Sequence, residues 1–185
     1  MPVSLVFTGH MIDLPGRTKP RFPASLEHEA RGEIKKRIER CRQAVLPSKI
    51  SGFASGARGG DILFHEVCRE VGIKTAIILP FSPERFLVKS VEGVPNSRWV
   101  QRFWKLWNDS EHNLFTEVMG LPETEDVYAL CNTRVLELAK KYGEVHVIAL
   151  WDGKGGDGPG GTADLVKQAK RVGDCPDVFA PSELN

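Results

Sequence analysis

The fold is decided by the run Glu144-Val-His-Val-Ile-Ala-Leu-Trp151 and the run that follows it, Asp152-Gly-Lys-Gly-Gly-Asp-Gly-Pro-Gly-Gly-Thr-Ala-Asp164. The first run is apolar and rich in β-branched residues, which predicts a buried strand, and residues 163–171 have helical periodicity. The second run holds six glycines in thirteen residues, and glycine allows positive φ and a close approach of the backbone to a ligand. The unpaired N–H groups and the dipole of a helix N-terminus favour an anion. This strand, turn and helix predict a phosphate-binding loop, with a flexible surface loop as the alternative.

The overall composition is that of a folded globular protein. The 185 residues are 41% hydrophobic and 26% charged, and 25 Lys and Arg stand against 24 Asp and Glu. A net charge of +1 argues against nucleic acid or an acidic membrane as a partner. No apolar run approaches the length of a membrane span, and the first residues lack a signal-peptide pattern. The four cysteines are widely spaced and indicate reduced thiols, so we expect one cytoplasmic domain over residues 1–185.

The same order of strand, turn and helix repeats along the chain. Hydrophobic patterning predicts strands at 3–8, 49–54, 74–79, 144–151 and 177–180, and helices at 24–45, 62–71, 84–91, 97–108, 123–142 and 163–171. The segment 112–118 is compatible with a further short strand. Alternating strands and helices predict an α/β fold, a Rossmann-like doubly wound parallel sheet with helices on both faces. Counting the five strands along the chain, we expect the order 3-2-1-4-5, with a helical insertion at about 81–143.

In such a sheet, ligands bind at the carboxyl ends of the strands, beside the point where the strand order reverses. Three connections would meet there: the loop 9–23, the turn 55–61 and the glycine-rich loop 152–162. The first carries His10 and Arg17. In the second, we expect Arg58 to project and hold a phosphate in a bidentate contact, with simple exposure as the alternative. Asp61 is predicted to cap the following helix, and a catalytic role is the weaker interpretation.

Several familiar motifs are absent. The glycine-rich loop formally contains G-x-G-x-x-G, but this fingerprint belongs in a first βα unit, and the P-loop motif does not occur. His65 and Glu66 resemble the start of H-E-x-x-H, yet the fifth position is Arg69, so we expect neither a metal nor another cofactor. Trp99, Phe103 and Trp107 recur at helical spacing, which indicates a core face or a partner surface.

Three segments together resemble the SLOG superfamily, which includes DNA-processing protein A and the LOG-type nucleotide phosphoribohydrolases. They are Val6-Phe-Thr-Gly-His-Met-Ile-Asp13, Ser51-Gly-Phe-Ala-Ser-Gly-Ala-Arg-Gly-Gly-Asp61 and Gly158-Pro-Gly-Gly-Thr-Ala163. The middle segment resembles the DNA-processing branch and the last resembles the LOG branch. The combination is most similar to SLOG domains of bacterial signalling and conflict-system proteins. The resemblance spans about residues 3–171 and implies a nucleotide-type ligand with contacts at Gly9, His10, Gly56, Arg58, Gly59, Gly60, Gly160, Gly161 and Thr162.

The resemblance also implies where catalytic chemistry would lie. In LOG enzymes, a glutamate three residues after the loop threonine serves glycosidic cleavage, but here Leu165 occupies that position and Asp164 lies one residue earlier. The loop also lacks the glycine before its threonine. We therefore expect a largely non-catalytic sensor that binds a nucleotide or nucleotide-derived signal of the AMP, ADP-ribose or cyclic nucleotide class.

Two alternatives remain open. One is a nucleotide N-glycosidase that uses Asp164 or Asp61 to stabilise a cationic ribosyl transition state. The other is a protein-interaction scaffold, and self-association into a homo-oligomer is also left open. The residues themselves add Arg17, Ser55, Asp61 and Gly158 to the ligand contacts named above, and Trp151 is a candidate for stacking on a base.

Overall fold

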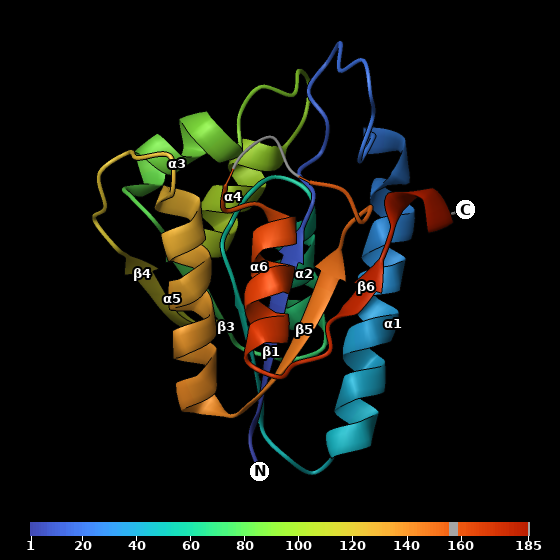
Figure 1. Cartoon of the computed structure of the whole chain (residues 1–185), viewed down its shortest axis with the longest axis vertical. Helices are drawn as coiled ribbons and strands as arrows, with labels where there is room; N and C mark the ends of the chain where they lie inside the picture. Colours follow the sequence, from blue (N-terminus) through green and yellow to red (C-terminus); the bar gives the residue numbers. More distant parts are fainter. Residues whose placement is uncertain (156–158, 185) are drawn as a thin grey trace.

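One all-parallel sheet of six strands, in the order β4-β3-β2-β1-β5-β6, forms the centre of the molecule (Figure 1). The computed structural model describes residues 1–155 and 159–184. The strands are β1 Val3–Gly9, β2 Ile50–Ala54, β3 Thr75–Leu79, β4 Asn113–Val118, β5 Glu144–Leu150 and β6 Asp177–Phe179. Of the four inner strands, β1, β2 and β3 are almost entirely buried along their lengths, as expected for parallel strands that are covered on both faces.

Helices connect the strands and cover both faces of the sheet. They are η1 Ala24–Leu26, α1 Glu27–Val45, α2 Gly60–Glu70, α3 Pro83–Ser90, α4 Trp99–Trp107, α5 Val127–Tyr142, α6 Thr162–Arg171 and η2 Pro181–Glu183. In Figure 1, α5 and α6 lie in front of the sheet, whereas α2 and α4 lie behind it.

Successive residues of the inner strands divide the core into two clusters. Leu5 and Phe7 point to the face of α1, α2 and α4, where they pack with residues such as Ile34 and Phe64. Val6 and its neighbours Phe53, Ala76 and Ile78 point to the face of α5 and α6, where they pack with Val135 and Leu165. This alternation follows from the two-residue period of a strand.

The predicted fold class is confirmed. The five expected strands correspond to β1, β2, β3, β5 and β6, and they have the expected order 3-2-1-4-5. The region 81–143 is more than a helical insertion, because the segment that was compatible with a strand forms β4 and pairs parallel to β3. The helix expected at 123–142 begins four residues later, at Val127.

The aromatic helix α4 faces inward. Trp99 and Phe103 are buried in the core, and Trp107 stacks on Phe103 at 6.2 Å between ring centroids. The Arg102 guanidinium lies 4.0 Å from the ring centroid of Trp99 and bonds the Glu66 carboxylate through Nε and Nη2 at 2.8 and 2.7 Å. Trp99 and Phe103 of this stripe therefore belong to the core, and Trp107 packs against it while partly exposed.

Candidate functional site

The strand order reverses between β1 and β5, which lie side by side at the centre of the sheet. From β1 the chain continues to α1 and β2 on one side, and from β5 it continues to α6 and β6 on the other. The loops after β1, β2 and β5 gather at the upper end of the view in Figure 1. The expected meeting of three connections at the carboxyl ends of the strands is therefore present.

His10 joins these three connections. Its backbone N–H donates to the Leu150 carbonyl at 3.0 Å, and its carbonyl accepts from the Gly60 N–H at 3.2 Å. Its side chain is buried, and Nε2 accepts from the Asp152 N–H at 3.2 Å. Burial lowers the pKa of His10, although Asp152 opposes this shift. The His10 side chain therefore ties the end of β1 to the glycine-rich loop.

The glycines of the second turn are required by packing between backbones. Gly59 has φ of +92°, and a Cβ there would lie 2.6 Å from the Ile12 nitrogen. A Cβ on Gly60 would lie 2.9 Å from the Phe7 ring, and one on Gly9 would meet the same ring at 2.8 Å. These three glycines let the turn after β2 lie directly against the end of β1.

Ser55 and Gly56 begin this turn. The Ser55 carbonyl accepts a hydrogen bond from His65 Nε2 at 2.7 Å, and the Thr75 hydroxyl lies 2.8 Å from His65 Nδ1. A Cβ on Gly56 would lie 3.1 Å from the Phe103 ring. Full burial lowers the pKa of His65 to about 3, so His65 is a neutral packing residue that supports the turn.

Arg58 does not project from the turn as expected. Its side chain is buried, with Nε donating to the Ile12 carbonyl at 3.0 Å and Nη1 to the Glu92 carbonyl at 3.2 Å. Burial lowers the pKa of the guanidinium. Because both carbonyls belong to segments distant in sequence, Arg58 holds the loop after β1 and the end of α3 together.

Asp61 does not cap α2. The helix begins at Gly60, with Gly59 at the N-cap, and the Asp61 carboxylate turns back to accept from the Ala57 N–H at 3.2 Å. The side chain is only 8% exposed, and burial raises its pKa to about 7. A buried carboxyl with a strongly raised pKa therefore lies in the first turn of this helix.

The start of α6 is held against α5. Gly160 has φ of +83°, and a Cβ there would lie 2.2 Å from the Ala129 nitrogen. Asn132 donates through Nδ2 to the Gly160 carbonyl at 3.0 Å and to Asp164 Oδ2 at 2.9 Å. Gln168 Nε2 donates to the same carboxylate oxygen at 2.8 Å. The sequence predicted neither amide as part of the site, because both belong to helices and no motif marks them.

Gly161 and Thr162 differ from Gly160 in their surroundings. A Cβ on Gly161 would meet nothing within 4 Å. Thr162 is only 9% exposed, and its hydroxyl has no hydrogen-bond partner among the described residues. The N–H groups of Asp61, Thr162 and Ala163 also have no acceptor within 1–155 and 159–184. Gly158, the other expected contact, lies outside the described residues.

The remaining predicted residues lie on the first and last loops. Arg17 bonds within the loop after β1, where Nε donates to the Lys19 carbonyl at 3.0 Å and lies 3.5 Å from Asp13 Oδ1. Arg21, which was not among the expected contacts, donates to the Gly155 carbonyl at 3.2 Å and so bridges the first and last loops. Trp151 is half-buried and donates to the Lys154 carbonyl at 2.7 Å.

Leu165 lies in the core rather than near the open N–H groups. It is buried in the cluster on the α5 face, together with Val135 and Ala169. Asp164, one position earlier, is partly exposed and engaged by Asn132 and Gln168. The position that the resemblance assigns to a catalytic glutamate therefore serves packing in this chain.

Within the described residues, no group of three His, Cys, Asp or Glu side chains is arranged to hold a metal ion. No helix in that part of the chain is long and apolar enough to cross a membrane.

Comparison with known proteins establishes the fold alone. No family model matches the chain, and no curated protein matches it. Among solved structures, it is similar to the X-ray structure of TM1055, a structural genomics target, with a TM-score of 0.50 and 16% sequence identity. The similarity covers 95% of this chain and 72% of TM1055. It supports the Rossmann-like α/β fold that the strand order shows.

Proposed function

We propose that this chain binds a nucleotide or nucleotide-derived signal at the N-termini of α2 and α6 and acts as a cytoplasmic sensor domain. The observation that carries the proposal is the set of unpaired donors at these two helix starts. The N–H groups of Asp61, Thr162 and Ala163 have no acceptor among the described residues. Helix α6 begins at the carboxyl end of β5, beside the reversal of strand order, and α2 begins at the carboxyl end of β2, which lies next to β1. Doubly wound sheets bind phosphorylated ligands in this region.

The side chains around these donors support an anionic group. The Thr162 hydroxyl has no partner among the described residues and its oxygen is not fully buried, so it can donate to a phosphate oxygen. The open space at Gly161 would let a ligand approach the backbone closely. The resemblance of the three loop segments to SLOG domains points to the same class of ligand. Arg58 would contribute through the position of the loops rather than through direct contact, because its Nε and Nη1 already bind carbonyls.

A second candidate is hydrolysis of an N-glycosidic bond, and Asp61 favours it. A buried carboxyl with a pKa of about 7 at a helix N-terminus could exchange a proton or stabilise a cationic ribosyl group. Asp164 is the less suitable candidate, since two amide groups already engage one of its oxygens. The buried position of Leu165 supports sensing over hydrolysis.

A thermal-shift screen of AMP, ADP, ATP, ADP-ribose, NAD and cyclic dinucleotides tests the proposal. A ligand at about 100 times its Kd adds about 2.7 kcal/mol, which corresponds to roughly 5–11 °C for a chain of this size. Gly161→Val should abolish the shift but leave the unliganded Tm nearly unchanged, because its Cβ meets nothing. Thr162→Val should weaken it while keeping the side-chain shape. Gly32→Ala on α1 is the control and should retain the full shift.

The outcomes separate the two functions. A shift without a chromatographic product supports sensing, whereas a product that disappears in Asp61→Asn supports hydrolysis. If no nucleotide at millimolar concentration shifts the Tm, or if Gly161→Val responds like the unmodified chain, the proposed site is wrong.

A further inference from the structure

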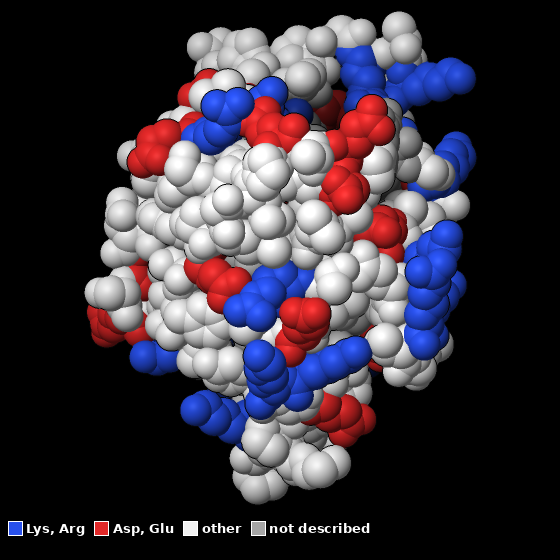
Figure 2. All heavy atoms as spheres, turned by 60° about the vertical axis from the view of Figure 1, so that its left-hand side comes forward, with Lys and Arg blue, Asp and Glu red and all other residues white. Residues whose placement is uncertain are grey.

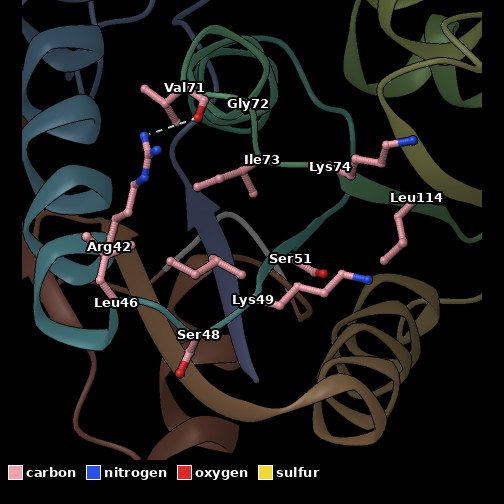
Figure 3. A pocket seen from close by; sticks show the side chains of 11 residues that line it. Arg42, Leu46, Ser48, Lys49, Ser51, Val71, Gly72, Ile73, Lys74 and Leu114 are labelled. Atoms are coloured by element: carbon pink, nitrogen blue, oxygen red, sulfur yellow. Dashed lines mark hydrogen bonds between the residues drawn. The ribbon is translucent and has the colours of Figure 1, made fainter. Parts of the chain in front are cut away.

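A second concave region lies at the opposite end of the sheet. A cavity of about 580 Å³ opens where β2 and β3 begin, far from the carboxyl ends that carry the proposed nucleotide site (Figure 3). Cavities of this volume are typical of small-molecule sites. Its lining comes from α1, the two connections that lead into β2 and β3, and the edge strand β4, and consists of Arg42, Leu46, Ser48, Lys49, Ile50, Ser51, Val71, Gly72, Ile73, Lys74 and Leu114.

The charges of this lining have one sign. Arg42, Lys49 and Lys74 are cationic, and no carboxylate lines the cavity. The ammonium groups of Lys49 and Lys74 have no hydrogen-bond or ion-pair partner in the part of the chain that the structure describes, whereas Arg42 donates to the Val71 carbonyl at 3.3 Å. In Figure 3, Lys49, Lys74 and Leu114 lie to the right of the view, and Arg42 lies near Val71.

The nearest acidic residue along the chain is already neutralised. Glu70 precedes Val71 and binds Arg31 Nη2 at 2.6 Å and Lys35 Nζ at 2.5 Å. These hydrogen bonds hold the pKa of Glu70 at about 2. Lysine and arginine side chains also gather toward the lower end of the molecule in Figure 2, with some acidic side chains among them. The cavity therefore lies in a region that attracts an anion.

Ser51 supplies an independent observation. It is only 4% exposed, and its hydroxyl has no hydrogen-bond partner among the described residues, although it lines the cavity. Its register partner on β1, Ser4, is also buried but donates to the Ala139 carbonyl at 2.8 Å. Among the described residues, Glu29 Oε2 is the only fully buried side-chain polar atom without a partner, so the unpaired Ser51 oxygen is open to the cavity that Ser51 lines. Ser51 is therefore a polar group in the wall of the cavity that no other described residue binds.

Most of the remaining lining is apolar. Leu46, Ile50, Ile73 and Leu114 add hydrocarbon surface to the same cavity. From this combination we propose that the cavity binds a small organic dianion of the phosphomonoester type. Lys49, Lys74 and Ser51 contact the oxyanion, and the aliphatic residues contact an apolar body. This site is separate from the proposed nucleotide site and does not depend on it.

A titration with phenyl phosphate, followed by ¹H–¹⁵N correlation spectra of the whole chain, tests the proposal. We expect saturable shifts at the amides of residues 48–52 and 71–74, with a Kd of about 1 mM. Inorganic phosphate, which lacks an apolar body, and phenol, which lacks charge, should each bind more weakly. The double variant Lys49→Ala with Lys74→Ala should raise the Kd about tenfold or more. Lys105→Ala, which removes an exposed lysine of α4 outside the lining, should not change it.

Ser51→Ala distinguishes binding from folding. Because the hydroxyl has no internal partner, its removal should leave the Tm unchanged or slightly raised, while the Kd increases several-fold. Shifts that do not saturate, that do not respond to the two lysines, or that fall only at the starts of α2 and α6 would overturn the proposal. Gly161→Val should bind phenyl phosphate normally, so a failure of the nucleotide site leaves this result intact.

Discussion

Asp61 and His65 illustrate how two buried groups on one helix can oppose each other in their effect on stability. Asp61 has its pKa raised to about 7 by burial, so the folded chain retains a proton that the unfolded chain loses above about pH 4. Stability due to this group therefore falls as the pH rises from about 4 to 7. His65 has its pKa lowered to about 3 by burial, so the unfolded chain gains a proton below about pH 6.5 that the folded chain does not take up. Stability due to His65 falls as the pH decreases.

Between about pH 4 and 6.5 the two effects cancel, and single substitutions should reveal each one. In Asp61→Asn, the free energy of unfolding should decrease on acidification by about 1.4 kcal/mol per pH unit more than in the unmodified chain. In His65→Gln, the difference should have the opposite sign and the same slope. Urea denaturation at pH 4.5, 5.5, 6.5 and 7.5 measures both slopes. Profiles that run parallel to the unmodified chain would show that these groups titrate normally.

The individual residues also show what the sequence could not reveal. Arg58 in a glycine-rich turn is compatible with a phosphate contact, but its partners are carbonyls of Ile12 and Glu92, 46 and 34 positions away. No local pattern encodes such a bond. Asp61 is a suitable capping residue by type, yet the N-cap is Gly59, two positions earlier, and the Asp61 carboxylate accepts from the Ala57 N–H instead.

Two neighbouring glycines of the last loop, Gly160 and Gly161, differ in whether the fold requires a glycine there. Gly160 needs its positive φ and its missing side chain to lie against α5, whereas Gly161 has ordinary backbone angles and open space. The sequence shows only a glycine-rich run, because the contacts that distinguish Gly160 from Gly161 come from α5, which is distant in sequence. The helix that follows was predicted within one residue at its start, because its apolar periodicity is local.

Glycine substitutions in α1 and in the loop before α6 should therefore have opposite effects. Gly32 lies exposed within α1, and a Cβ there would meet nothing within 4 Å, so Gly32→Ala should stabilise the chain by about 0.5–1 kcal/mol. Gly160→Ala should destabilise it by about 2 kcal/mol or more, because the new Cβ would overlap the α5 backbone at a positive φ. Denaturant unfolding followed by circular dichroism measures both. A Gly160→Ala variant within about 0.5 kcal/mol of the unmodified chain would contradict this account.

Across the whole molecule, the sheet was predictable where strands are buried on both faces. Thr75–Leu79 is buried throughout and reads as a continuous apolar run. The edge strand Asn113–Val118 has no fully buried residue, so its sequence gave a weak signal for a strand. Its place beside β3 depends on the two helices between them and on a shifted register near Thr75, which are tertiary features.

The central and edge strands should differ in how fast their backbone amides exchange with solvent. The β1 strand is hydrogen-bonded to both β2 and β5 and buried on both faces, so its amides should exchange with solvent only through global unfolding. The β4 strand lies at the edge of the sheet and pairs only with β3. Its amides that bond to β3 should therefore exchange through local opening. If local opening of β4 costs about 3 kcal/mol less than unfolding, its amides exchange roughly a hundredfold faster. Native-state hydrogen exchange resolves the two strands in one experiment. Equal protection of both would mean that β4 unfolds together with the central sheet, and that the edge strand belongs to the same cooperative unit as β1.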